Sequence, residues 1–174
     1  GPDHHKRLAA RGKLPVRERV FHFLDPDSPF LEISGLAAYK SEYPIGGGAF
    51  AGIGVSSGIE CVIFANDPTV LAGAMHFYSV KKWMRCMQIA RDCRIPFIQF
   101  VESAGGDLRP RAGAAVGGMG HFAESGRQFY EITELSKLNI PTVTVAFGTA
   151  TAGGAYQPGI CLLYTSPSPR DRLL

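Results

Sequence analysis

The chain has few cysteines, and none of them stands at a metal-binding or redox spacing. Only four occur in 174 residues, and no two of them form a CxxC pair. They are Cys61, Cys86, Cys93 and Cys161. We therefore expect neither a disulfide framework nor a zinc site, and no metal in this domain. The simplest interpretation is a set of unreacted thiols in a reducing compartment.

Long apolar runs and a strong charge bias are also absent. No apolar run approaches the ~20 residues that span a bilayer, and the opening GPDHHKR lacks the apolar core of a secretory signal. Because no initiator Met is present, we expect the chain to begin within a longer protein. The formal net charge of +3 is too small to indicate nucleic acid and is compatible with an anionic small molecule. A hydrophobic content of 45% predicts one domain with a sizeable core.

Glycine, by contrast, is abundant, and the 21 glycines cluster at the ends of apolar runs. These runs alternate between strand and helix periods. We expect two helical pieces broken at Pro15 within 7–24, a hairpin of strands 49–55 and 60–66, a helix over 79–93, a strand over 96–101, a helix over 122–138, a strand over 142–147, and a helix that begins within 148–155. This order predicts an α/β fold with right-handed crossovers and largely parallel pairing.

The helix over 79–93 has the clearest pattern. Its apolar positions recur at i, i+3, i+4, i+7 and i+10, as Val80, Trp83, Met84, Met87 and Ala90. We expect Lys81, Lys82 and Arg85 to face outward. They could meet phosphates, but a solvated helix face is the simpler interpretation.

A glycine-bearing loop follows each expected parallel strand, at residues 72–74, 104–106 and 152–154. Ligands of such sheets bind beyond the carboxyl ends of the strands. We therefore expect the functional site where these three loops meet.

The loop that contains Gly153 and Gly154 is the strongest candidate. It leads from a strand into a helix, whose first amides lack internal acceptors and experience the positive end of the helix dipole. Two glycines would let a ligand oxygen approach these amides without meeting a Cβ atom. That geometry suits an oxyanion hole, although a glycine-rich turn that only permits tight helix–sheet packing explains the spacing equally well.

No side chain stands out as a nucleophile, acid or base. Ser103 lacks the GxSxG context of a nucleophile elbow and suits a turn that bonds its own backbone. His76 could line the site or face solvent, and His121 suits a cap or a surface position. Glu102 and Asp107 could do acid–base work, but capping and loop hydrogen bonds are favoured. The residues therefore predict a site of backbone amides, in which a substrate or cofactor takes the proton.

Several longer segments resemble one known family. ANDPTVLAGAM…VKKWMRCMQIA at 65–90 is similar to the NDxTVxGG…VKKxxRxxEIA signature of acyl-CoA carboxylase carboxyltransferase subunits. IPFIQFVESAGGDL at 95–108 resembles their strand and DSGGAxL loop, and HFAESGRQFY…TATAGGAYQPG at 121–159 resembles their HFGxxFY helix and TAGGAYxPA turn. ARGKLPVRERVFHFLDPDSPFLEI at 10–33 is similar to their basic N-terminal helices. The resemblance covers about residues 6–160 and is to the N-terminal half of a biotin-dependent carboxyltransferase (beta) subunit. We therefore expect residues 1–160 to form this domain, incomplete at its C-terminal end.

The resemblance implies a truncated crotonase-like (ClpP/crotonase) spiral of ββα units, with acyl-CoA held against backbone amides. Carboxybiotin on a partner would supply the carboxyl group, and the ureido nitrogen of biotin would take the proton. The resulting enolate would take up the carboxyl group at its α- or γ-carbon. Gly153 and Gly154 would be the catalytic amide donors. The implied acyl-CoA-binding positions are Ala72, Gly73, Ala74, Ser103, Ala104, Gly105, Gly106 and Ala155.

The resemblance also implies partners: acyl-CoA, a biotin carboxylase or biotin carrier subunit, and further copies in a homo-oligomer joined through N-half/C-half interfaces. Nucleic acid and membrane are not expected. The location would be the bacterial cytoplasm, or the mitochondrial matrix in a eukaryote. His121-Phe122 and the AGGAY spelling favour the methylcrotonyl- and acetyl-type branch over the propionyl branch. Alternatives are a biotin-dependent decarboxylase subunit, a crotonase-like hydratase or isomerase with a carboxylate facing the thioester, and a non-catalytic assembly subunit.

Two stretches depart from the family. Ala104 and Gly106 invert the usual Gly-Gly-Ala order, and the loop 109–120 is too rich in glycine to interpret. From Cys161 the chain reads CLLYTSPSPRDRLL, which resembles the translation of a sequencing-library adapter. We expect 161–174 to be a non-native tail, the alternative being a divergent natural one. Because the C-terminal half of the family's active site is missing, we expect the chain alone to be inactive. An unfinished spiral also leaves a sheet edge and apolar surface uncovered, which predicts self-association.

Overall fold

The computed structural model describes residues 2–109 and 122–165, and within these ranges six strands form one sheet. The helices are α1 (Pro2–Ala10), α2 (Val16–Phe23), α3 (Phe77–Cys93), α4 (Phe122–Lys137) and α5 (Gly153–Gly159). The strands are β1 (Leu31–Glu32), β2 (Ala49–Ser56), β3 (Ile59–Asn66), β4 (Phe97–Ser103), β5 (Thr142–Ala150) and β6 (Leu163–Thr165). A 3₁₀ turn, η1 (Leu71–Gly73), follows β3.

The sheet has the order β1-β2-β3-β4-β5-β6. The first three strands pair antiparallel, whereas β3, β4, β5 and β6 are parallel neighbours. The predicted hairpin and the predicted parallel crossovers are therefore confirmed. Neither β1 nor β6 was among the strands that the sequence pattern predicts, since each is only two or three residues long.

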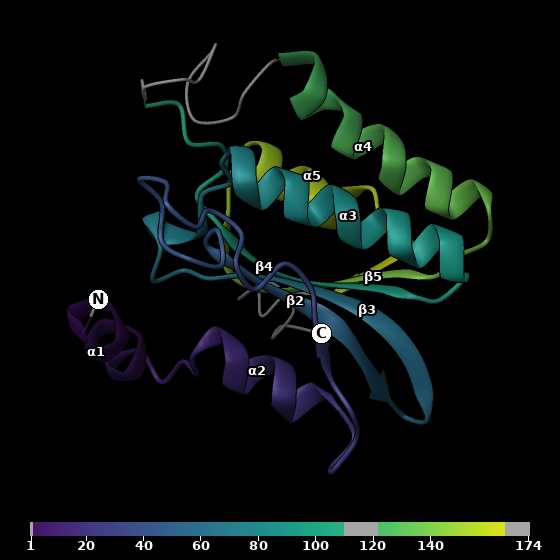
Figure 1. Cartoon of the computed structure of the whole chain (residues 1–174), viewed down its shortest axis with the longest axis horizontal. Coiled ribbons are helices and arrows are strands. Elements are labelled where there is room, and N and C mark those ends of the chain that lie inside the picture. Colours follow the sequence, from purple (N-terminus) through teal and green to yellow (C-terminus); the bar gives the residue numbers. More distant parts are fainter. Residues whose placement is uncertain (1, 110–121, 166–174) are drawn as a thin grey trace, which may run out of the picture.

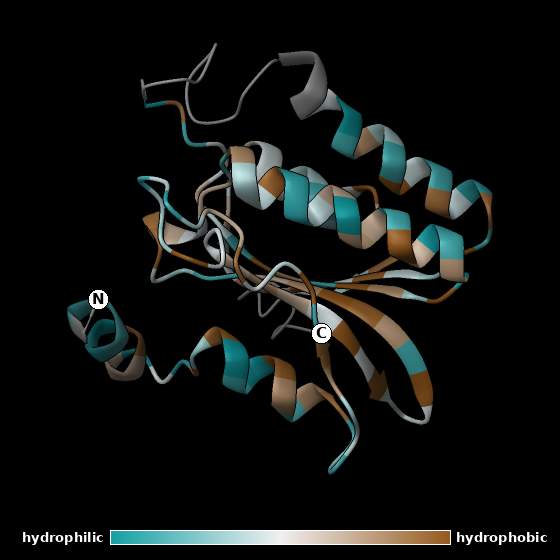
Figure 2. Ribbon diagram, in the orientation of Figure 1, coloured by the Kyte–Doolittle hydropathy of each residue, from teal (hydrophilic) through white to brown (hydrophobic). Residues whose placement is uncertain are grey.

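Helices cover both faces of the sheet (Figure 1), with α3, α4 and α5 on one side and α1 and α2 on the other. The first face packs around Trp83 and Phe64, and the second around Val20, Ile63 and Phe100. Figure 2 shows the matching pattern, in which α3 and α4 carry hydrophilic residues on their outer sides while the strands are largely hydrophobic. The break expected at Pro15 lies between α1 and α2.

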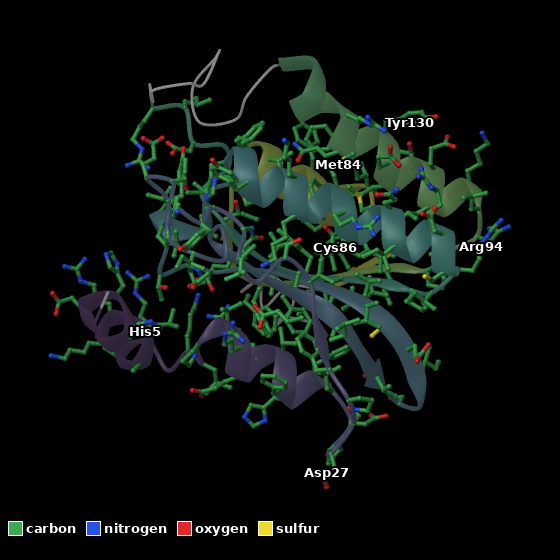
Figure 3. All side chains as sticks on the ribbon, viewed as in Figure 1. His5, Asp27, Met84, Cys86, Arg94 and Tyr130 are labelled. Carbon is green, nitrogen blue, oxygen red and sulfur yellow. The ribbon has the colours of Figure 1, made fainter. Side chains whose placement is uncertain are left out.

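The apolar stripe of α3 faces the core as predicted, with Val80, Trp83, Met87 and Ala90 buried. Figure 3 shows α3 with Met84 and Cys86 labelled. Burial raises the pKa of the Cys86 thiol to about 12, and that of Cys61 to about 11. These two thiols are inert core groups, as expected. Cys93 is exposed, and Cys161 is half-buried.

The prediction that Lys82 faces solvent is wrong. Its side chain is only 2% exposed, and Nζ donates to the carbonyl oxygens of Ala49 at 2.7 Å and Gly46 at 3.2 Å. The loop before β2 covers this side of α3, so the helical period alone could not reveal it. Burial lowers the pKa of the Lys82 ammonium, because the charged form has lost its hydration.

The pH dependence of stability should report this burial. Because the folded-state pKa of Lys82 lies below its unfolded value, the unfolded chain binds more protons between the two values, and stability rises with pH there. We expect the Tm of the chain to increase relative to that of a Lys82→Met variant as pH rises toward 10.5. Thermal unfolding from pH 7 to 10.5 measures this. Lys81→Met, at an exposed neighbour, is the control, and parallel Tm profiles for the chain and Lys82→Met would contradict the expectation.

Candidate active site

The three glycine-bearing loops meet at the carboxyl ends of β3, β4 and β5, as the sequence predicts. The Ala104 amide donates to the Ala72 carbonyl at 3.1 Å, and the Thr151 amide donates to the Ser103 carbonyl at 3.1 Å. The first bond joins the β4 loop to η1, and the second joins it to the turn before α5. Residues 103–104 thus connect both outer loops to the middle strand.

The first outer loop, η1, has a left-handed backbone at three successive residues, with φ of 50° at Leu71, 52° at Ala72 and 74° at Gly73. The amides of Gly73 and Ala74 donate back into the turn, to the carbonyls of Val70 at 2.8 Å and Leu71 at 3.0 Å. Among the described residues, no acceptor lies opposite the Ala72 amide. Within the described residues, the turn therefore leaves the Ala72 amide uncommitted, together with that of Leu71.

The second outer loop leads into α5 and behaves similarly. Its N-cap residue Ala152 has φ 47° and ψ −124°. The Gly154 amide donates to the Thr151 carbonyl at 2.9 Å, and the Ala155 amide donates to the Ala152 carbonyl at 2.9 Å. Within the described part of the chain, the Gly153 amide has no such acceptor. The structure thus differs from the expectation of two free glycine amides, because turn bonds engage Gly154.

The two glycines have different steric roles. A Cβ atom added at Gly154 would lie 3.0 Å from Cβ and Oγ of Ser103, so this glycine permits close packing of α5 on the β4 loop. At Gly153, an added Cβ would have only Phe129 Cζ near it, at 3.8 Å. The two neighbouring glycines therefore differ: close packing requires a glycine at Gly154, whereas Gly153 has open space beside it.

The middle loop contains no activated nucleophile. Ser103 is 1% exposed, and its Oγ accepts a hydrogen bond from the Gly105 amide at 3.1 Å, which is the turn role that the sequence favours. Strand β4 extends through Ser103, so the prediction that this strand ends at residue 101 is wrong. Pairing with Ala150 of β5 across a bulge prolongs the strand beyond its apolar run. Gly106 bridges to Met75, which continues the parallel contact toward α3.

Glu102 and Asp107 are both held by cations. Glu102 forms ion pairs with Lys13 and Arg19 rather than the loop hydrogen bonds that the sequence favours. Asp107 accepts bonds from Arg109 at 2.8 and 3.0 Å, and these hold the pKa of its carboxyl below the ordinary value. Both carboxylates are thus engaged by cationic side chains, which does not suit a base that must face a substrate.

His76 is fully buried, which excludes the solvent-facing alternative. Its ring stacks on Tyr43 with centroids 3.8 Å apart, and the Tyr43 hydroxyl donates to Asp107 Oδ2 at 3.3 Å. Tyr43 thereby fastens the loop before β2 to the middle loop of the site. No sequence signal marked Tyr43, because it lies in an irregular segment far from its partners. His121 and the 110–120 part of the adjoining loop lie outside the described residues.

Two further findings bear on the sequence expectations. Among residues 2–109 and 122–165, no group of three His, Cys, Asp or Glu side chains is placed to hold a metal ion. In the same ranges, no helix combines the length and apolar character needed to cross a membrane.

A Gly73→Ala substitution should destabilise the chain strongly. A Cβ at this position would overlap the Glu102 carbonyl oxygen, and the backbone has φ 74°, which disfavours alanine. We expect a loss of about 2–4 kcal/mol in the free energy of unfolding, from strain plus displacement of β4. Gly153→Ala is the control, with an expected change below about 1 kcal/mol. Denaturant unfolding of both variants tests this, and equal losses would contradict the steric argument.

Comparisons with known proteins show which sequences and structures the chain is similar to. Residues 7–164 match the model of the family described as the carboxyl transferase domain. The chain is 46% identical over 160 residues to a probable biotin-dependent acyl-coenzyme A carboxylase beta2 subunit of Mycobacterium tuberculosis, covering 92% of the chain and 29% of that protein. It is 45% identical over 158 residues to the biotin-dependent 3-methylcrotonyl-coenzyme A carboxylase beta1 subunit of the same organism, covering 89% and 29%. The chain thus spans less than a third of these relatives.

Solved structures show the same likeness. The beta subunit of geranyl-CoA carboxylase from P. aeruginosa superposes with a TM-score of 0.81 at 34% identity, over 98% of the chain and 33% of that subunit. Transcarboxylase 12S superposes with a TM-score of 0.76 at 20% identity, over 94% of the chain and 32% of its own, and shows the shared fold alone.

Proposed function

The chain belongs to the carboxyl transferase domain family, and from this premise we propose that it forms part of a carboxyltransferase that moves a carboxyl group from carboxybiotin to an acyl-CoA. Its fold is the crotonase-like α/β arrangement that the sequence predicts. Because the chain spans less than a third of its curated relatives, the complete activity is proposed for the longer polypeptide that carries this segment.

The observation that carries the proposal is that each of two adjoining turns has an uncommitted amide, at Ala72 and at Gly153. The Ala72 amide and the Gly153 amide belong to loops that both bond to the end of β4, and neither has an acceptor among the described residues. Such fixed donors stabilise an enolate oxygen as negative charge develops on it, without the reorganisation that water would require. In this proposal the thioester carbonyl of the acyl-CoA accepts both amides.

In this proposal, the other site residues surround this carbonyl. Gly154 and Ala155 set the first turn of α5, and Gly73 and Ala74 set the turn after Ala72. The middle loop, with Ser103, Ala104, Gly105 and Gly106, lines the acyl-CoA. The sequence proposal of Gly153 and Gly154 as catalytic residues is thus refined: Gly153 donates, and Gly154 supports.

The pairing of both described carboxylates at the strand ends, Glu102 and Asp107, favours this function over a hydratase or isomerase. Glu102 is engaged by Lys13 and Arg19, and Asp107 by Arg109 and Tyr43. A biotin group carried on a partner subunit would supply both the carboxyl group and the base, so the chain need only bind, orient and stabilise charge. A biotin-dependent decarboxylase would use the same site in reverse and remains the second candidate.

The substrate class that we propose is a 3-methyl-branched 2-enoyl-CoA, carboxylated at the γ-carbon. Support comes from the names of its relatives, which include a 3-methylcrotonyl-CoA carboxylase at 45% identity and a geranyl-CoA carboxylase at 34%. An acetyl-/propionyl-coenzyme A carboxylase beta5 subunit is only 28% identical. In such substrates the double bond transmits enolate charge to the γ-carbon, so the same two amides can serve the reaction.

The remaining proposals concern assembly and boundaries. We propose a biotin carboxylase or biotin carrier subunit as partner, a homo-oligomer, and a location in the bacterial cytoplasm or the mitochondrial matrix. We also propose that 161–174 is adapter-derived, although the family match runs to residue 164. Leu163 and Tyr164 of β6 are 63% and 61% exposed, which suits a segment without a packing role. Natural coding sequence in the parent nucleic acid beyond Ile160 would contradict the adapter origin.

Substrate selection can be measured directly. The polypeptide that carries this segment, combined with its biotinylated partner, ATP and labelled bicarbonate, should carboxylate 3-methylcrotonyl-CoA with a kcat/KM at least ~10-fold above those for acetyl-CoA and propionyl-CoA. That factor corresponds to about 1.4 kcal/mol of discrimination, within the range of one or two methyl groups in an apolar pocket. A preference for propionyl-CoA would overturn the substrate proposal, and no transfer to any acyl-CoA would overturn the function.

Deleting the Gly153 N–H tests the amide role. Gly153 is the first residue of α5, where proline is tolerated, and proline has no amide hydrogen. Ala152 must also become glycine, because the proline ring would clash with its Cβ. We expect Ala152→Gly/Gly153→Pro to lower kcat by about 10²–10³-fold, the usual effect of removing one oxyanion donor.

The matched control is Ala152→Gly/Gly153→Ala, which retains the N–H and should keep kcat within about 10-fold of the unsubstituted protein. Carboxyl transfer by the two double variants is measured side by side, together with Tm. Equal kcat values in both, at similar Tm, would show that the Gly153 amide has no catalytic role.

A further inference from the structure

The carboxylate of Glu102, at the end of β4, meets two cations from the N-terminal helical segment. Its Oε2 accepts a hydrogen bond from Arg19 Nη1 at 2.8 Å, and its Oε1 accepts one from Lys13 Nζ. Arg19 lies on α2 and is 7% exposed, and Lys13 lies in the connection between α1 and α2. Arg19 Nε also donates to the Leu14 carbonyl at 2.8 Å, which fixes the guanidinium on its own segment. We refer to Lys13, Arg19 and Glu102 as the anchor cluster.

The backbone at Glu102 touches both amide-bearing turns. Its carbonyl oxygen occupies the space that a side chain at Gly73 would need, so η1 packs directly on it. The Ser103 carbonyl accepts a hydrogen bond from the Thr151 amide at 3.1 Å. The Ala104 amide donates to the Ala72 carbonyl at 3.1 Å. A shift of this strand end would therefore move both turns together.

Strand β5 is shaped to admit the anchor cluster. A Cβ atom at Gly148 would lie 2.6 Å from Lys13 Nζ and 2.7 Å from Glu102 Oε1. Gly148 does not adopt a positive φ, so an added side chain would conflict with the ends of the Lys13 and Glu102 side chains and not with the backbone conformation. The first glycine of the stretch GTATAGG is thus explained by the anchor cluster rather than by an oxyanion.

We propose that the anchor cluster positions the two amide-bearing turns for carboxyl transfer, with Lys13, Arg19 and Glu102 as positioning residues. This rests on the proposed function. Buried ion pairs contribute little net stability because both charges lose hydration, and Arg19 Nη2 is buried without a hydrogen-bond partner among the described residues. Their value lies in holding the end of β4 at one position. Displacement of a donor by ~1 Å can cost on the order of 10²-fold in rate.

Steady-state kinetics of the polypeptide that carries this segment, with its biotinylated partner, separate positioning from simple support. We expect Lys13→Met to lower kcat by about 10–100-fold while KM for the acyl-CoA changes less than about three-fold. Lys13→Arg, which keeps a donor for Glu102, should recover kcat to within about three-fold. The matched control is Arg17→Gln, which breaks the exposed ion pair between Arg17 of α2 and Glu32 of β1 and should leave kcat unchanged. A kcat for Lys13→Met equal to that of Arg17→Gln would overturn the proposal.

Amide hydrogen exchange of the chain itself gives a readout that does not depend on activity. The Ala104 and Thr151 amides should exchange faster in Lys13→Met and in Gly148→Ala, whose Cβ would displace Lys13, but not in Arg17→Gln. Faster exchange in a protein that shows no carboxyl transfer would sink the proposed function and leave the anchor cluster in place. Unchanged exchange, with full activity of Lys13→Met, would refute the anchor cluster alone.

Discussion

The end of β4 lies between η1 and the turn before α5, and the arrangement of the site depends on its contacts with both. The Glu102 carbonyl packs against Gly73. The next two residues, Ser103 and Ala104, form backbone hydrogen bonds with Thr151 and Ala72, respectively. Parallel pairing of β3, β4 and β5 brings these segments to one edge of the sheet. Register alone would leave the loops free to move, and the direct backbone contacts at β4 remove that freedom.

A site built from backbone amides has a different requirement from one built from side chains. A catalytic side chain can reorient on its own, whereas an amide moves only with its turn. The buried charged groups around these loops serve that requirement. Glu102 engages two cations, Asp107 bonds to Tyr43 and Arg109, and Lys82 holds the loop before β2 through two carbonyl groups. Each fixes backbone, and none is placed as a proton donor to a substrate.

Periodicity in the sequence was sufficient for the hairpin, for α3 and α4, and for the parallel strands between them. It failed where one residue's environment comes from a distant segment. Lys82 sits at a position that the pattern of α3 alone leaves outward, yet the loop before β2 covers it. The length of β4 was underestimated for the same reason, because Glu102 and Ser103 are polar residues buried by contacts from other parts of the chain.

The sequence by itself determined the class of fold and the clustering of glycines at three strand ends, because these follow from local period and composition. The family followed from the resemblance of its longer motifs, which the family match over residues 7–164 bears out. Only the tertiary structure decided which amides are uncommitted. Turn bonds engage Gly154 and leave Gly153, and they engage Gly73 and Ala74 but leave Ala72. It also decided that Gly148 makes room for an ion pair between segments 89 residues apart. A glycine in a sequence permits several roles, and the atoms that surround it in the folded chain select among them.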